Sequence, residues 1–144
     1  MVRAAAAGRL CKAERGARSE GLGRAVMEQQ EFARQTLLVL TNLPDQASAQ
    51  ALATMLVTER LAACVNLLAP CRSVYRWQGA IDSAEETPLL IKTTAERYAA
   101  LEAAIRARHP YELPEIIAVP LACGLPDYLA WVAAETMVED TPQC

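Results

Sequence analysis

The chain has 144 residues, of which 53% are apolar and 22% are charged, so it fits one domain with a hydrophobic core and lacks the composition of a disordered protein. No apolar run approaches the roughly 18 residues that cross a bilayer, which excludes an integral membrane protein. The net charge of −3 is unevenly distributed, with +4 on residues 1–26 and −7 on the remainder, and an acidic domain lacks the basic face that a nucleic-acid partner requires.

The first 26 residues are rich in small residues and arginines and contain almost no large apolar side chains, so they cannot anchor themselves to a core. Three interpretations stay open: a flexible leader, an organelle transit peptide, or translated sequence ahead of a true start at Met27. A secretory signal is disfavoured because its apolar central region is missing. We expect residues 1–30 to form a flexible leader or upstream extension and residues 31–140 to form the folded domain.

From residue 36 onward, the spacing of apolar residues and the position of prolines and glycines indicate the type of each segment. A strand is expected over residues 36–41, followed by a helix over 44–60 and strands over 61–68 and 73–77. A polar hairpin region over 78–87 then precedes a strand over 88–93, a helix from 95 to Pro110, a strand over 114–121 and a helix over 126–135.

This order of elements predicts an α+β fold, a ferredoxin-like split βαβ sandwich. The two longer helices would cover one face of the sheet. Because the strands are so apolar, the other face also needs a cover, and the most economical cover is another copy of the chain. The expected partner is therefore the chain itself, with neither nucleic acid nor membrane involved.

Motifs for nucleotide phosphates, zinc proteolysis and serine hydrolysis are missing from the sequence. The one histidine, His109, cannot form a multi-histidine metal site, although Cys64, Cys71, Cys123 or a carboxylate could join it in space. Two interpretations of His109 stay open, a metal ligand and a hydrogen-bonding group at a helix end. Five cysteines without a CxxC pair indicate reduced thiols in a cytosol-like compartment, so we expect a cytoplasmic protein.

Three segments contain more special residues than packing explains: ACVN at residues 63–66, SVYRWQGAI at 73–81 with two glutamates after it, and HPYELPEI at 109–116. Together with Lys92 and a late YLAW at 128–131, these motifs resemble the CutA family, which is named for divalent cation tolerance. The resemblance covers about residues 36 to 136, and several ordered motifs match at the expected intervals.

The resemblance implies a ferredoxin-like subunit in a tight homotrimer, with an architecture similar to the nitrogen-regulatory PII proteins. It also implies a non-enzymatic function in the tolerance of, or response to, divalent metal ions such as copper. In the family, the hairpin with the motif aromatics extends across subunits, and the HPYE turn lies near a cleft between them. The expected interface or cleft residues are Asn66, Tyr75, Trp77, Lys92, Tyr111, Glu115 and Trp131.

Some bacterial members of the family associate copper with a cysteine near the end of the first strand and two adjacent histidines at the HPY turn. Here Thr41 and Arg108 stand at two of these positions, and only His109 remains, so this copper site should be weak or absent. We expect a divalent cation, copper or zinc, to bind weakly at His109 and Glu112, and no cofactor to be obligatory.

Two alternatives to a metal-tolerance trimer stay open. One is a PII-like small-molecule signalling trimer with ligand clefts between subunits. The other is an acylphosphatase-like enzyme that uses Asn66 to position water and Arg72 to bind phosphate, but it rests on fold analogy and its loop lacks the glycines that aim main-chain N–H groups at an anion. We therefore expect a protein that is not an enzyme.

Overall fold

The structure is a computed structural model that describes residues 13–138. It divides into two units with the boundary between Ala33 and Arg34, and each unit is described by itself. The first unit contains helix α1, Ala13–Arg34, whose side chains from residue 21 to residue 32 are exposed to solvent. The sequence analysis did not predict this helix, because the segment shows no apolar face. The flexible leader stays a prediction, and its residues 1–12 lie outside the described part.

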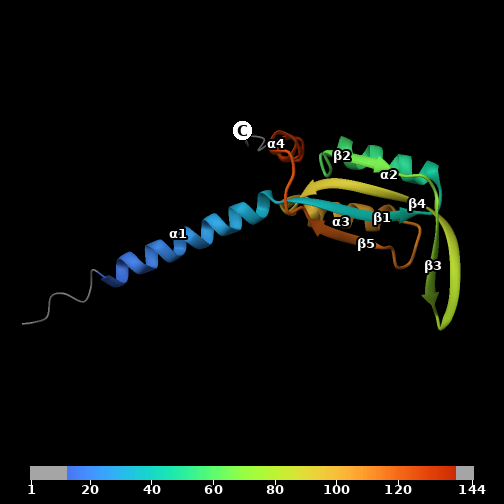
Figure 1. Ribbon diagram of the computed structural model, residues 1–144, viewed down its shortest axis with the longest axis horizontal. Coiled ribbons are helices and arrows are strands. Elements are labelled where there is room, and N and C mark those ends of the chain that lie inside the picture. The colour runs from blue at the N-terminus through green and yellow to red at the C-terminus, as the bar shows by residue number, and fades with distance from the viewer. Residues whose placement is uncertain (1–12, 139–144) are drawn as a thin grey trace, which may run out of the picture. The chain divides into compact units, whose positions relative to one another are not determined.

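The second unit is built on an antiparallel sheet of five strands within the described residues (Figure 1). Its strands are β1 (Thr36–Leu43), β2 (Cys64–Leu67), β3 (Cys71–Trp77), β4 (Ala80–Thr94) and β5 (Ile116–Pro120). The order is β2-β4-β1-β5, and β3 pairs only with the first half of β4. Since β4 runs antiparallel between β1 and β2, this is the split βαβ arrangement of a ferredoxin-like fold, as predicted.

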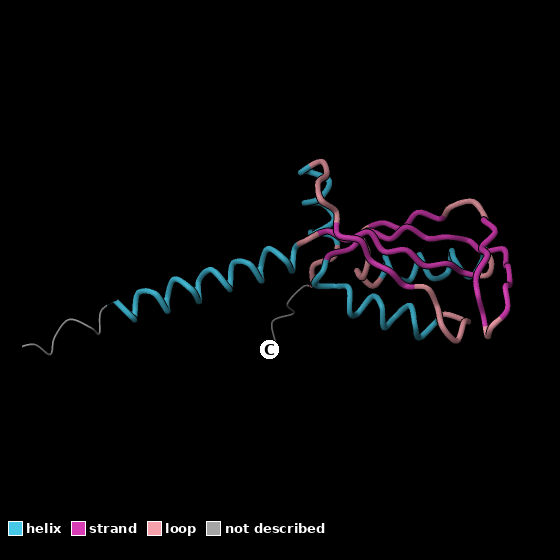
Figure 2. The backbone as a smooth tube through the Cα atoms, turned by 60° about the horizontal axis from the view of Figure 1, so that its bottom comes forward, coloured by secondary structure: helices cyan, strands magenta, loops and turns pink. Residues whose placement is uncertain are grey.

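Helices α2 (Gln46–Thr58) and α3 (Ala95–Arg108) lie on the same side of the sheet (Figure 2), and α4 (Pro126–Glu135) follows the last strand. The start of α2 is fixed by its N-cap residue, Asp45, whose carboxylate accepts a hydrogen bond of 2.7 Å from the main-chain N–H of Ser48. All three helices were predicted within about two residues of their observed ends.

Two sequence-based boundaries differ clearly from the structure. The strand predicted over residues 61–68 is only Cys64–Leu67, and the hairpin region is much shorter than predicted. Residues 78–87 were predicted as a polar hairpin region, but only Gln78 and Gly79 form the turn, and β4 begins at Ala80. The two halves of β4 differ in their surroundings: residues 80–85 are largely exposed in a two-stranded ribbon, whereas residues 86–94 are buried in the main sheet. A strand without a buried face shows no apolar alternation, so the pattern could not reveal it.

The hydrophobic core lies between the sheet and helices α2 and α3. Alternate residues of β1 face this core, including Val39 and Leu43, and they pack with Leu56 of α2 and with Leu101 and Ile105 of α3. The neighbouring positions of β1 point to the other side of the sheet. That side, defined by Leu38, Leu40, Ile117 and Val119 and called the open sheet face here, is partly exposed to solvent.

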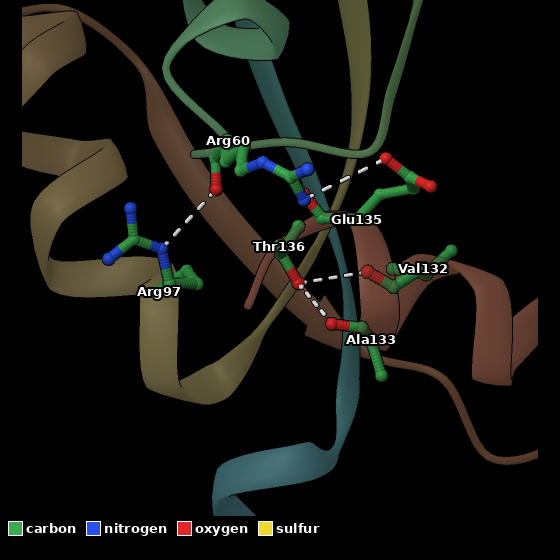
Figure 3. Close-up of polar contacts among 6 residues, drawn as sticks. All are labelled: Arg60, Arg97, Val132, Ala133, Glu135 and Thr136. Atoms are coloured by element: carbon green, nitrogen blue, oxygen red, sulfur yellow. Dashed lines mark hydrogen bonds and ion pairs between the residues drawn. The ribbon is translucent and has the colours of Figure 1, made fainter. Parts of the chain in front are cut away.

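Arg60, which follows the C-cap of α2, connects helix α4 to the rest of the unit (Figure 3). The guanidinium Nη1 of Arg60 donates to the main-chain oxygen of Glu135 at 3.3 Å, and Arg97 of α3 donates to the main-chain oxygen of Arg60 at 3.3 Å. At the end of α4, Thr136 donates back to the main chain of Val132. None of the helices within residues 13–138 is both long and apolar enough to cross a membrane.

Candidate functional site

A cleft of about 810 Å³ opens between the β3–β4 hairpin and the turn that follows α3. It brings together five residues that the sequence analysis assigned to an interface, a cleft or a metal site: Tyr75, Trp77, Tyr111, Glu112 and Glu115. These residues are far apart in the sequence, so their convergence depends on the fold. We call this site the hairpin cleft.

One wall of the cleft is the β3–β4 hairpin, whose conformation and register are fixed by its two-residue turn. Gln78 and Gly79 have φ angles of 47° and 81°, the left-handed conformation that primed hairpin turns require and that glycine adopts without strain. The turn fixes the register, which places Tyr75 opposite Asp82 and Trp77 opposite Ala80. Because side chains alternate along a strand, the two aromatic residues and Asp82 share one face of the hairpin, and all three line the cleft.

The opposite wall is the HPYE turn, which is held by His109. The imidazole is 9% exposed, and both of its nitrogens have main-chain partners. The N–H of Tyr111 can only donate, so Nδ1 accepts it at 3.2 Å, and Nε2 therefore carries the hydrogen that is donated to the main-chain oxygen of Asn42 at 2.7 Å. The rings of His109 and Tyr111 also pack, with centroids 4.9 Å apart.

These contacts do not fit a tight copper centre. A metal ion at His109 has to displace one of its two main-chain hydrogen bonds, because a coordinating nitrogen needs a free lone pair. Thr41 lies inside β1 rather than at its end, and its side chain is fully buried with no hydrogen-bond partner for Oγ1. Arg108 is exposed. Among the described side chains of residues 21–138, no group of three or more His, Cys, Asp or Glu residues is arranged to hold a metal ion.

Polar contacts organise the floor of the cleft. The side-chain amide of Asn42 donates to Glu115 at 2.5 Å, which links the end of β1 to the segment before β5. Glu86 of β4 is only 8% exposed and faces the phenol of Tyr111. Burial raises the pKa of Tyr111, and the negative charge of Glu86 raises it further, so this phenol stays neutral at physiological pH.

The other predicted interface residues do not line the hairpin cleft. Asn66 on β2 and Lys92 on β4 are neighbours in the main sheet, where the ammonium of Lys92 donates to the side-chain oxygen of Asn66. Trp131 lies on α4 with its ring 5.6 Å from that of Tyr128, whose pKa is raised by burial and then by Cys64. Within a single subunit, the predicted interface and cleft residues therefore lie in separate groups.

The lining residues that the sequence analysis did not assign to a site include Asn42, Asp82 and Glu86. The two-residue turn is a sequence signal that could have identified Asp82 and Glu86. If Gln78 and Gly79 are taken as a two-residue hairpin turn, the register follows directly and places Asp82 and Glu86 on the same face as Tyr75. No local pattern points to Asn42, because it reaches the cleft only through its contact with Glu115.

Comparison with a family model and with the sequences of known proteins points to the same family. The family model for the CutA1 divalent ion tolerance protein matches residues 37–135. The divalent-cation tolerance protein CutA of Thermus thermophilus is 43% identical over 99 residues, which cover 69% of this chain and 96% of that protein.

Solved structures agree with this match. The crystal structure of CutA from Xylella fastidiosa has 46% identity and a TM-score of 0.70, and the match covers 72% of this chain and 99% of that one. A CutA from Archaeoglobus fulgidus, described as a periplasmic divalent cation tolerance protein, has 31% identity and a TM-score of 0.69 over 71% of this chain and 99% of its own.

Proposed function

Because this chain belongs to the CutA1 divalent ion tolerance protein family, we propose that it works as a homotrimer in the tolerance of divalent metal ions such as copper, without catalysis. In this proposal the hairpin cleft lies next to a subunit boundary and takes a small ligand. The observation that carries the proposal is the open sheet face, because apolar side chains on that side of the sheet, Ile117 and Val119 among them, stay about half exposed in a single subunit.

The open sheet face is suited to contact with further copies of the chain. Ile117 and Val119 are 50% and 54% exposed, and each lies beside a leucine of β1 in the antiparallel register. Helices α2 and α3 already cover the other side of the sheet, so none of their apolar residues are available for this one. A contiguous apolar surface of this kind is typical of an obligate interface, which resembles a domain core cut in two.

The β3–β4 hairpin supports the same proposal. Its outer part is a two-stranded ribbon with apolar side chains exposed on both faces, Tyr75 and Trp77 on one and Val74 and Ile81 on the other. An isolated ribbon of two strands is marginally stable in water, so it gains stability when it packs on a neighbouring subunit. Such packing would bring the hairpin cleft to a boundary between subunits.

For metal ions, we propose weak binding of copper or zinc at His109 with help from Glu112, and no obligatory cofactor. One imidazole and one exposed carboxylate form an incomplete ligand set. His109 also has to give up a main-chain hydrogen bond before it can coordinate. Both features favour low affinity, so the contribution to metal tolerance would be regulatory or indirect rather than storage of copper.

The absence of catalysis is also proposed from the position of the candidate residues. Asn66 accepts a hydrogen bond from Lys92 in the main sheet, and Arg72 lies on the exposed ribbon opposite Glu85. The two residues of the acylphosphatase alternative therefore lie on different parts of the sheet. For location we propose the cytoplasm, since Cys64, Cys71 and Cys123 are free thiols.

A growth assay tests this function. The host is a bacterial strain that lacks its own CutA-family protein and grows poorly with added copper(II). We expect the full chain to restore growth and the Ile117→Asp variant, which puts a charge on the open sheet face, to fail. Val57→Asp, which changes an exposed valine of α2, is the matched control and should restore growth. Equal rescue by Ile117→Asp at equal protein level, or no rescue by the full chain, would contradict the proposal.

A further inference from the structure

The hairpin cleft has an unbalanced charge. Its lining contains four carboxylates and a single guanidinium, that of Arg76. The acidic residues come from both walls: Asp82 and Glu86 from β4, and Glu112 and Glu115 from the turn after α3. The cleft therefore carries a negative potential that attracts cations, and its low-dielectric walls strengthen that field.

Glu86 is the least exposed of these carboxylates, at 8%. It forms no ion pair with a described side chain of residues 21–138, and its partner Tyr111 is a neutral phenol that shares a hydrogen bond with it. A phenol leaves the negative charge of a carboxylate uncompensated, and a group of this kind at the wall of a cleft is suited to bind a positively charged ligand. Glu86 thus points to a cationic ligand independently of the other acidic residues.

The geometry favours an organic cation over a metal ion. A metal ion needs at least three ligands that converge on one point, and the carboxylates of the cleft do not form such a group within the described residues. They come from β4 and from the turn after α3 and line a cavity of about 810 Å³, which is large enough for a molecule of several carbon atoms. Separated negative charges match a ligand whose positive charges are separated as well.

The aromatic rings of the hairpin cleft also suit an organic cation. Tyr75 and Trp77 line one wall of the cleft and Tyr111 lines the other. The face of an aromatic ring attracts an ammonium group, and the ring also packs against a methylene chain, so a cleft with both carboxylates and aromatics suits an aliphatic amine.

We propose that the hairpin cleft binds an aliphatic polyamine, with its ammonium groups at the carboxylates and its methylene chain along the aromatic rings. This inference rests on the proposed function, since it specifies the class of ligand for the same cleft. Glu86 holds one ammonium group at the buried end, and Glu112 or Glu115 holds another nearer the opening.

Calorimetric titration of the full chain with spermidine tests the proposal, with light scattering on the same samples to record the assembly state. We expect saturable binding that weakens as salt is raised. Glu86→Gln keeps the shape of the side chain and should weaken binding about tenfold or more, because a charge-assisted hydrogen bond is lost. Glu112→Gln, at an exposed position where folding is not at risk, should weaken it about threefold.

The matched control is Glu85→Gln. Glu85 is the sequence neighbour of Glu86 but lies on the opposite face of β4 and does not line the cleft, so its substitution should leave affinity within about twofold. The ligand control is 1,8-octanediol, which has a comparable chain without charge and should not bind. Binding of the diol, or equal losses in Glu85→Gln and Glu86→Gln, would overturn the proposal.

The assembly state separates failure of this inference from failure of the proposed function. A trimer that binds no spermidine at millimolar concentration would refute the polyamine site and leave the proposed function in place. A chain that stays monomeric would contradict the proposed function itself. Binding of zinc with the same dependence on Glu86 and no binding of spermidine would also refute this inference, since it would assign the cleft to a metal ion.

Discussion

The imidazole of His109 donates a hydrogen bond of 2.7 Å to the main-chain oxygen of Asn42, which joins the turn after α3 to the end of β1. The same ring accepts a hydrogen bond from the N–H of Tyr111, so one side chain fixes two segments beside the hairpin cleft. This histidine has a structural role in the fold, in addition to any contact with a metal ion.

We predict that His109→Ala destabilises the protein by about 1–3 kcal/mol, because it leaves the main-chain groups of Asn42 and Tyr111 without their partner in a mostly buried site. Urea unfolding at a fixed chain concentration measures this change. Arg108→Ala, at the exposed neighbouring position, is the control and should change stability by less than about 0.5 kcal/mol. Equal stability of His109→Ala and the wild type would show that these hydrogen bonds contribute little.

The second prediction is weak metal binding. Calorimetric titration of the reduced protein with copper(II) and zinc should show low affinity, and His109→Ala should abolish it. The physical reason is that coordination by His109 competes with its main-chain hydrogen bonds. Tight stoichiometric copper binding that survives His109→Ala would contradict this site and direct attention to Cys64, Cys71 and Cys123.

The third prediction concerns acid stability and Asp45. Hydrogen bonds from Ser48, first from its main-chain N–H and then from its hydroxyl, lower the pKa of this carboxyl below 3.8. A lowered pKa in the folded state means that the ionised form adds stability above pH 3.8 and loses it as the pH falls through the lower value. We expect Asp45→Asn to be less stable than the wild type at pH 7.

The difference between Asp45→Asn and the wild type should shrink as the pH falls below 3.8, because asparagine cannot ionise. Melting temperatures between pH 7 and pH 2 measure it. Glu59→Gln removes one negative charge just past the other end of α2 and controls for net charge. A constant difference at all pH values would show that ionisation of Asp45 does not contribute to stability.

The fourth prediction is that deletion of residues 1–26 leaves assembly and melting temperature nearly unchanged. The side chains of residues 21–26 are exposed, and the segment offers little apolar surface to a core. Scanning calorimetry and light scattering on the shortened chain provide the comparison. A fall in melting temperature of several degrees would mean that this segment docks on the assembled protein.

The fifth prediction is that a charge on the proposed subunit interface weakens assembly. Trp77→Glu in the hairpin and Ile117→Asp on the open sheet face should each promote dissociation, since an unpaired charge in an interface costs several kcal/mol. Val57→Asp, on the exposed side of α2, should leave assembly intact. Sedimentation velocity over a range of concentrations distinguishes these outcomes, and identical behaviour of the three variants would count against the interface.

Much of the fold could be predicted from the sequence, because most of its helices and strands have strong local sequence signals. The apolar run of β1, the N-cap at Asp45 and the prolines that bound α3 and α4 each identify an element without knowledge of its neighbours. The outer half of β4 carries no such signal, since Asp82 and Glu85 lie in a ribbon that is open to solvent on both faces.

The candidate site could be predicted from the sequence only in part. Aromatic and HPYE motifs predict Tyr75, Trp77 and Tyr111 as residues of an interface or of a cleft between subunits, and all three line the hairpin cleft of the single subunit. The role of Glu86 depends on the register of the hairpin and on burial by the turn after α3, and both are long-range properties. For the same reason, the sequence could not show that both nitrogens of His109 are occupied by main-chain groups.

The central claim is that this chain assembles into a homotrimer through its open sheet face. Multi-angle light scattering of the full chain at low micromolar concentration tests it most directly. We predict a particle with three times the 15.6 kDa mass of the chain, unchanged on tenfold dilution, because the interface would bury apolar surface from every subunit. A mass of one chain at these concentrations would contradict the account, since the exposed Ile117 and Val119 would then remain in contact with water.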